Sequence, residues 1–226
     1  MRGSSAAPPL IREALYSASS NLFSESGLNL DQKGIWEDLG DIEFAGEVAV
    51  ENFKKIKTFV KDVLVADQKL VSLGGDHSVS WPILDAHLDI WDALDILHID
   101  AHPDLYDSLL GNKLSHASPF ARIMEAGRAS RLVQVGIRTL NKHQREQAEK
   151  FGVEIYQMKD LTKLSSLSFS KPVYCSIDID ALDPAYAPGV SHFEPGGLST
   201  RQLIDCLNGF KGRLIGADIV EYNPKR

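Results

Sequence analysis

The amino-acid sequence predicts an α/β fold in which a mostly parallel sheet is covered by helices on both faces. From residue 69 onward, short apolar runs alternate with segments of helical pattern, which is typical of chains that form parallel sheets. The 226 residues are 43% hydrophobic and 24% charged, and this suits one globular domain with a sizeable core. We therefore expect a single domain over residues 1–226.

The individual elements follow from periodicity and from turn residues. A pair of prolines opens a predicted helix at 8–18, and residues 22–45 have no clear period, so we expect a long loop there. A second helix, over 49–64, is amphipathic because its apolar residues recur every 3.6 positions. Strands are predicted at 69–73, 94–100, 131–136, 153–156, 172–178 and 213–221, and further helices at 79–88, 118–126, 141–150 and 200–209.

The charge and the cysteines exclude several classes of protein. With 31 acidic and 24 basic residues the formal charge is −7, which argues against a nucleic-acid or anionic-membrane partner and suits a cationic ligand. No apolar run approaches the ~20 residues of a membrane span. Cys175 and Cys206 are too few for a disulfide framework, so we expect a reducing compartment, the cytoplasm, with the mitochondrial matrix as the alternative.

Acidic residues and histidines gather at the ends of three predicted strands. The motifs are GGDHS at 74–78, DAHPD at 100–104 and DID at 178–180. In an open α/β sheet, ligands bind outside the carboxyl ends of the strands. Residues two apart in an extended segment face the same way, so Asp100 with His102, and Asp178 with Asp180, can each present two side chains to one point.

These motifs predict a metal site. Four carboxylates would offset two divalent cations, and two imidazoles would add nitrogen ligands without charge. Oxygen and nitrogen ligands without thiolate favour manganese or a similar ion over a structural zinc. One DxD or HxD motif alone is common in loops and caps, but three such motifs at strand ends indicate a shared site. The candidate ligands are His77, Asp100, His102, Asp104, Asp178 and Asp180.

The motifs GGDHS, DAHPD and SIDIDALDP, in this order, resemble the three signatures of the arginase–agmatinase (ureohydrolase) family, from about Ala7 to Arg226. The stretches HASPFARIMEAG, QVGIR, AYAPGVSHFEPGGLS and GADIVEYNP are most similar to its agmatinase and plant-type arginase branch. The resemblance implies a three-layer α/β/α sandwich that assembles as a homo-trimer or homo-hexamer. It also implies that the six ligands bind two Mn²⁺ ions per subunit, with Asp100 and Asp178 bridging.

The resemblance further implies that the protein hydrolyses the guanidino group of agmatine or L-arginine and releases urea. His116 matches the family histidine that transfers a proton to the leaving amine, and Glu221 matches the glutamate that holds the substrate guanidinium. A carboxylate meets a guanidinium through two parallel hydrogen bonds, so the second role is chemically sensible. Without the resemblance, His116 would be interpreted as a loop imidazole or helix cap, and Glu221 as a solvated charge at a strand end.

The choice of substrate depends on the loop after DAHPD. Animal-type arginases have there, two residues after the last aspartate, an asparagine that recognises the α-carboxylate of arginine. This chain has Tyr106, followed by the acidic Asp107, which slightly favours agmatine although plant-type arginases resemble the same loop. A metallophosphoesterase is a rival interpretation, but its GNH-type motif is absent. A catalytically weak or silent guanidino- or polyamine-binding relative is the other alternative, against which the intact ligand set argues.

Other polar residues are expected to be structural. We expect His98 to be a satisfied core histidine and His87 and His143 to lie on helix surfaces, while Asp76 and Asp183 are candidates to orient ligands by hydrogen bonds. His192 lies in a loop that flanks the pocket. Measured against the family pattern, a first strand before Met1 and a helix after Arg226 are missing, so the domain is expected to be incomplete at both ends and to have an unpaired sheet edge.

Overall fold

A computed structural model describes residues 3–44, 46, 48–64, 68–161 and 167–226. At its centre is a six-stranded sheet in the order β1-β6-β5-β2-β3-β4, in which all neighbouring strands are parallel. The six predicted strands are all present, with ends that differ by at most two residues. They are β1 (Leu70–Leu73), β2 (Leu94–Ile99), β3 (Ala129–Ile137), β4 (Glu154–Gln157), β5 (Val173–Asp178) and β6 (Leu214–Val220).

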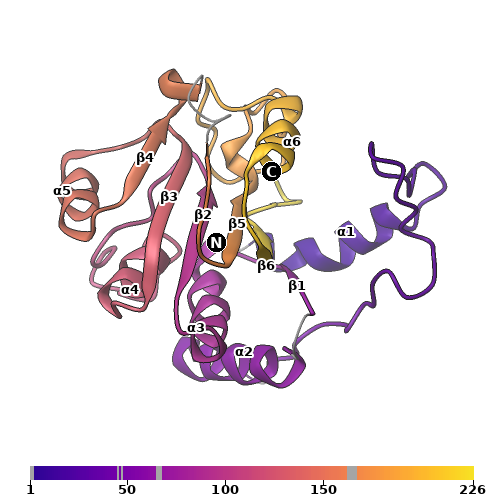
Figure 1. The fold of residues 1–226 in the computed structure, drawn as a ribbon, viewed down its shortest axis with the longest axis horizontal. Coiled ribbons are helices and arrows are strands. Elements are labelled where there is room, and N and C mark those ends of the chain that lie inside the picture. Colours follow the sequence, from indigo (N-terminus) through magenta and orange to yellow (C-terminus); the bar gives the residue numbers. More distant parts are fainter. Residues whose placement is uncertain (1–2, 45, 47, 65–67, 162–166) are drawn as a thin grey trace.

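Helices cover both faces of this sheet, as Figure 1 shows, so the predicted arrangement in three layers is confirmed. On one face lie α2 (Ala49–Val63), α3 (Ser80–Ile90), α4 (Pro119–Glu125) and α5 (Lys142–Phe151). On the other face lies α6 (Thr200–Gly209). Successive residues of β2 alternate between the two layers: Ile96 packs in the core beneath α2–α4, and Leu97 packs in the core beneath α6.

Local sequence signals fix where these elements begin and end. The side chain of Asn141 caps α5 by accepting a hydrogen bond from the backbone N–H of Gln144, and Gly152 ends the helix in the left-handed region, at φ 65°. Ser199 and Gln202 form a capping box at the start of α6. The central strands β2 and β5 are buried along their whole length. Their position in the core therefore also fixes where the residues at their carboxyl ends lie.

The N-terminal segment forms an arm that leaves the body of the molecule (Figure 1). It begins with a 3-10 turn at Ser4–Ala6 and α1 (Ala7–Leu15), which ends earlier than the predicted helix at 8–18. The predicted loop follows, with one isolated bridge between Phe23 and Asn29, and its last residue, Ala45, lies outside the described residues. Tyr16 stacks on Trp36, with ring centroids 6.0 Å apart.

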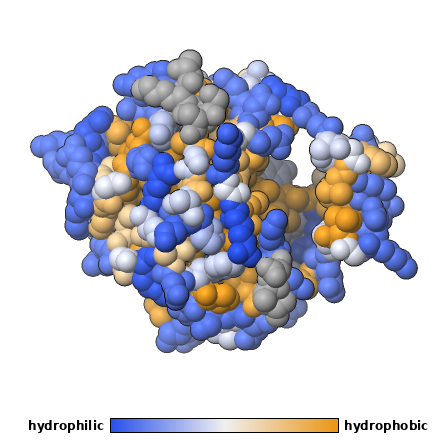
Figure 2. Space-filling model, in the orientation of Figure 1, coloured by the Kyte–Doolittle hydropathy of each residue, from blue (hydrophilic) through white to orange (hydrophobic). Residues whose placement is uncertain are grey.

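Much of the arm's surface is apolar, as Figure 2 shows at the side of the body. Leu10, Ile35 and Leu39 are among its exposed apolar side chains.

Within the described ranges, none of the helices is both long enough and apolar enough to cross a lipid bilayer.

Candidate metal centre

The order of the strands brings the predicted site residues to one edge of the sheet. The strands β1, β6, β5 and β2 are consecutive neighbours, so their carboxyl ends lie side by side. His77 follows β1, Asp178 ends β5, Asp100 follows β2 and Glu221 follows β6. The six predicted ligands meet here, in two groups that share Asp100.

The first group surrounds His77, which is fully buried. Its Nδ1 lies 3.1 Å from Oδ2 of Asp100, 3.2 Å from Oδ2 of Asp104 and 3.3 Å from Oδ2 of Asp178. Among the described residues this nitrogen has no partner with hydrogen-bond geometry. Burial lowers the pKa of His77, but the three carboxylates outweigh burial and raise that pKa well above its ordinary value.

The second group surrounds His102. Its Nδ1 lies 3.4 Å from Oδ1 of Asp100 and 3.2 Å from Oδ2 of Asp180. Burial lowers the pKa of His102, but these two carboxylates raise it to about 12. Asp180 in turn donates its backbone N–H to Oδ1 of Asp178, at 2.8 Å, so the two residues of the DID motif are held together.

The arrangement fits divalent cations. Carboxylate oxygens of Asp100, Asp178 and Asp180 lie within 4.8 Å of one another, so three negative charges would repel strongly if nothing positive lay between them. Burial raises the pKa of Asp178 well above its ordinary value, and burial followed by the charge of Asp100 raises the pKa of Asp104 to about 6. The donors are carboxylate oxygens and imidazole nitrogens, which suit a hard or borderline divalent ion.

A row of buried polar residues lies one pleat below the ligands. Ser176, His98 and Gln134 occupy matching register positions on β5, β2 and β3, and Asp218 is paired with Ser176 on β6. Ser176 donates its hydroxyl to Asp218 at 2.6 Å, so it must accept from Nε2 of His77 at 2.9 Å. That bond leaves Nδ1 of His77 as the nitrogen available to a cation. The sequence singles out only His98 from this row, as a core histidine. It predicts no role for Ser176, Gln134 or Asp218.

The loop that carries Asp180 is fastened by Arg138. The guanidinium of Arg138 donates to the backbone carbonyls of Asp180 at 2.7 Å, Ala181 at 3.2 Å and Glu194 at 2.7 Å. The Glu194 carboxylate then lies 3.6 Å from Nε2 of His102, on the side of the ring away from the metal-facing Nδ1. Arg138 belongs to the QVGIR stretch, which is similar to the agmatinase and plant-type arginase branch, but the sequence predicts no role for it.

Glu221 is buried, so its interpretation as a solvated strand-end charge is wrong. It is 4% exposed, and its backbone has a positive φ of 67°, which residues other than glycine rarely adopt. Its Oε1 accepts the backbone N–H of His77 at 2.9 Å, while Oε2 has no hydrogen-bond partner among the described residues. Burial raises the pKa of Glu221 to about 7.

His116 lies at the mouth of the site, half-buried in the loop before α4. Its ring centroid is 6.1 Å from that of His192, which is itself 5.1 Å from the ring of His102. Burial lowers the pKa of both His116 and His192. The ring of His192 thus lies between those of His116 and His102, and His192 flanks the pocket as expected.

Two further expectations differ from the structure. His87 is not on the surface: it is fully buried, with Nδ1 2.9 Å from the carbonyl oxygen of Ile83, because α3 is packed between α2 and the sheet. Asp183 does not contact the ligands either. Its carboxylate accepts the backbone N–H groups of Ala185 and Gly196 at 3.0 and 2.8 Å and so shapes the loop.

The amino-acid sequence is similar to those of proteins named arginase and agmatinase. A family model described as "Arginase family" matches residues 1–226. The chain is 46% identical to "Arginase 2, chloroplastic/mitochondrial" of Arabidopsis thaliana, over 100% of this chain and 70% of that protein. It is 36% identical to an "Agmatinase" of Bacillus cereus, over 83% of this chain and 67% of that protein.

The structure is also similar to a solved one. The "Arginase from Medicago truncatula" superposes with a TM-score of 0.94 at 46% identity, over 100% of this chain and 76% of that chain. The higher identity to the plant arginases does not favour the slight preference for agmatine that Tyr106 indicates. The whole-chain family match and the shared fold together show that this chain belongs to the arginase family of metal-dependent hydrolases.

Proposed function

We propose that the chain is a dinuclear manganese ureohydrolase that releases urea from a guanidino substrate. The observation that carries this proposal is the position of Asp100, whose Oδ2 faces His77 at 3.1 Å and whose Oδ1 faces His102 at 3.4 Å. One carboxylate therefore belongs to both ligand groups, as a bridging ligand must. His77 and Asp104 would complete one metal site, and His102 and Asp180 the other. Asp178, which lies near both His77 and Asp180, would be the second shared ligand.

Manganese is the proposed metal because the ligands are carboxylates and imidazoles, with no thiolate among the six residues. When bound, the two cations would lower the pKa of a water molecule and make it a nucleophile near neutral pH. The chain's own contribution is to hold the ligands in fixed orientations, and the row below them supports His77 in this way through its bond to Ser176.

The proposed guanidinium-binding residue is Glu221. Its unpartnered Oε2 is a buried acceptor, and leaving such a group unsatisfied costs about 1–3 kcal/mol. A guanidinium offers N–H donors and a positive charge, so it would satisfy this oxygen and favour the ionised carboxylate. His116 is the proposed proton donor to the departing amine, since it lies at the mouth of the site and not among the ligands.

L-arginine is the proposed substrate, with agmatine as the second candidate. The identity to plant arginases over the whole chain supports arginine. Agmatine is supported by Tyr106, which stands where animal-type arginases have the asparagine that recognises the α-carboxylate. The Tyr106 hydroxyl accepts the Asn141 side-chain amide at 2.5 Å, and its ring stacks on His143. In either case the product released beside the amine is urea.

The test is a urea-release assay on both substrates, with and without added Mn²⁺. We expect manganese-dependent urea release, faster with L-arginine than with agmatine. Faster release from agmatine would reverse the choice of substrate. If neither guanidino compound yields urea from fully manganese-loaded protein, the proposed activity is wrong and the silent-relative interpretation holds.

We further propose a mitochondrial location and a trimeric or hexameric assembly for this chain. The names of the Arabidopsis and rice relatives place those proteins in mitochondria or chloroplasts, which favours the mitochondrial alternative over the cytoplasm for this chain. A trimer or hexamer is the expected assembly, and mass photometry of the purified protein would measure it directly. Fractionation of the source cells would test the compartment.

A further inference from the structure

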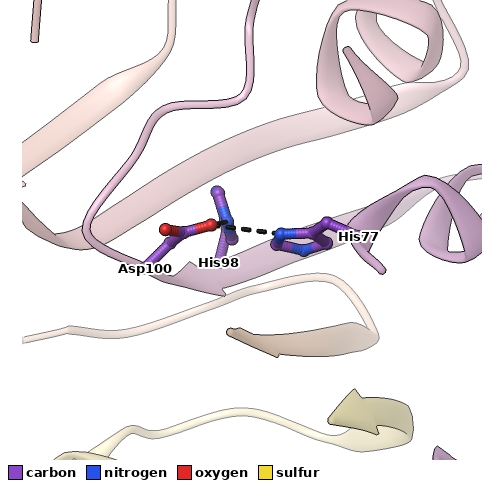
Figure 3. A group of neighbouring side chains, drawn as sticks. All are labelled: His77, His98 and Asp100. Carbon is purple, nitrogen blue, oxygen red and sulfur yellow. Dashed lines mark hydrogen bonds and ion pairs between the residues drawn. The ribbon is translucent and has the colours of Figure 1, made fainter. Parts of the chain in front are cut away.

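A buried histidine, His98, lies directly behind the shared ligand Asp100. It is the second-last residue of β2, is fully buried, and has its Nε2 2.8 Å from Oδ2 of Asp100 (Figure 3). One face of its ring stacks on Phe120 with centroids 3.9 Å apart, and the ring meets that of His77 edge to face at 5.0 Å. The ring therefore cannot turn without displacing another buried side chain.

Gln134 fixes which nitrogen of His98 carries the proton. The side-chain amide of Gln134 lies 2.6 Å from the carbonyl oxygen of Pro103 and 3.0 Å from Nδ1 of His98. A carbonyl oxygen only accepts hydrogen bonds, so the Gln134 atom that faces Pro103 must be the amide nitrogen. The same nitrogen donates to Nδ1 of His98, which leaves Nε2 as the protonated nitrogen that donates to Asp100.

The Asp100 carboxylate is consequently held at both oxygens. Oδ1 accepts the backbone N–H of His102 at 2.6 Å, and Oδ2 accepts Nε2–H of His98. These two bonds set the plane of the carboxylate, and its remaining lone pairs are turned toward the two ligand groups. Gln134 also donates to the carbonyl oxygen of Pro103, which lies between the ligands His102 and Asp104. The side-chain amide of Gln134 therefore also holds the backbone between these two ligands.

We infer that His98 is a positioning residue, which holds Asp100 as the ligand shared between two metal ions, and that Gln134 supports it by fixing its tautomer. The inference rests on the proposed dinuclear site. Nε2 of His98 could in principle be a ligand itself, because it lies with His77 and Asp100 in a group of metal-binding side chains. Both of its nitrogens are already engaged in hydrogen bonds, which favours the positioning role.

The experiment measures manganese binding to the metal-free protein and its variants by calorimetry, and the coupling between bound ions by electron paramagnetic resonance. His98→Phe keeps a ring that stacks on Phe120 but removes the donor. His98→Gln returns an N–H near the position of Nε2. The matched control is His87→Phe, which alters another fully buried histidine. Its ring stacks edge to face with Tyr174 at 4.8 Å, and its Nδ1 lies 2.9 Å from the carbonyl oxygen of Ile83, which is not a ligand.

We expect His98→Phe to weaken the binding of at least one ion by about 10- to 100-fold, the usual effect of losing an outer partner of a ligand. Its spectrum should change from that of a coupled pair to that of an isolated manganese ion. His98→Gln should recover most of the affinity and the coupled spectrum, and His87→Phe should bind as the wild type does. If His98→Phe binds and couples like the wild type, or if both phenylalanine variants are weakened equally, the inference is wrong.

Two further arms keep the result decisive. If His98→Phe does not fold, Gln134→Leu takes its place: weaker binding in that variant supports the inference, and unchanged binding overturns it. If His98→Gln, which cannot ligate as an imidazole, loses one ion entirely while Gln134→Leu binds normally, His98 is a ligand and not a positioning residue. A wild-type protein that binds no manganese would instead reject the proposed metal centre itself.

Discussion

The carboxylate of Glu221 accepts a hydrogen bond from the backbone N–H of His77 at 2.9 Å. The residue proposed to bind the guanidinium is therefore attached to the backbone of a proposed metal ligand, although 144 positions separate the two in the chain. The bond uses one oxygen of the carboxylate and leaves the other for the substrate. If the two residues have their proposed roles, this one backbone N–H group would fix the position of the substrate relative to that of the metal.

Glu221→Gln should reduce catalytic efficiency without releasing metal. The amide oxygen can still accept from His77, but the negative charge that attracts the guanidinium is gone. We expect kcat/KM to fall about 10- to 150-fold, which corresponds to the ~1.5–3 kcal/mol of a charge-assisted hydrogen bond. Kinetics on L-arginine and agmatine, with manganese content measured in parallel, would check this. An unchanged kcat/KM on both substrates would rule out the proposed role.

Asp178→Ala should lose at least one of two manganese ions. Its Oδ2 faces His77 at 3.3 Å, and its Oδ1 holds the backbone of Asp180, so both ligand groups depend on it. Elemental analysis of reconstituted protein would give the stoichiometry. Asp183→Ala is the matched control, since that aspartate lies on the same loop but bonds only backbone N–H groups there. Two ions retained in Asp178→Ala would remove it from the ligand set.

His116→Ala should keep its manganese and lose turnover. The imidazole lies beyond the six ligands, with its ring 6.1 Å from that of His192. If it transfers a proton to the leaving amine, kcat should fall by about 10²-fold. His143→Ala, which removes a histidine whose Nε2 lies 3.2 Å from Asp107, is the control for the metal content and should leave it unchanged. Loss of metal together with activity in His116→Ala would contradict the assignment.

Asp89 on α3 should make stability depend on acid pH. It lies 3.0 Å from the amines of Lys57 and Lys61 and 2.9 Å from Arg128. Burial raises the pKa of Asp89, but these cations outweigh burial and hold it well below its ordinary value. Because the folded pKa is depressed, the stabilisation is present above the unfolded pKa of about 3.9 and is lost as pH falls toward the folded pKa.

Asp89→Asn should therefore lower the free energy of unfolding by about 1 kcal/mol at pH 7, the upper range for exposed ion pairs. Urea denaturation at pH 7 and at pH 3 would measure the difference between the variant and the wild type, which cancels the effect of acid on the rest of the molecule. The difference should shrink at the lower pH. A difference that is the same at both pH values would mean that the ion pairs of Asp89 do not stabilise the fold.

The strands and the six ligands could be predicted from the sequence because their signals are local. Each strand is a short apolar run, and His77, Asp100 and Asp178 each lie at or just after the end of such a run. What joins them is not local. The pairing of β1 with β6 links Leu70 to Gly216, and no pattern within either segment indicates that partner. Glu221 follows β6, which lies between β1 and β5 because of that pairing. The burial of Glu221 therefore could not be predicted from the sequence.

The supporting residues had a weaker signal that could have been used. His98 and Ser176 each lie two positions before a ligand in a buried strand, and residues two apart share a face. A polar side chain in such a place must find a buried partner. Arg138 and His87 offered no such clue. The carbonyls that Arg138 binds belong to a distant loop, and the burial of His87 depends on α2 covering α3.

The placement of β6 also has a consequence for how the molecule is made. This strand is the last of the six to leave the ribosome, yet it lies between β1 and β5 and is the sheet neighbour of β1. The turn that bears His77 can therefore gain its support only after almost all of residues 1–226 have been synthesised. Pairings over such long separations form slowly. Uptake of metal would then be among the last events in the maturation of the protein. A nascent chain halted before β6 would carry all six proposed ligands without the strand that holds their site together.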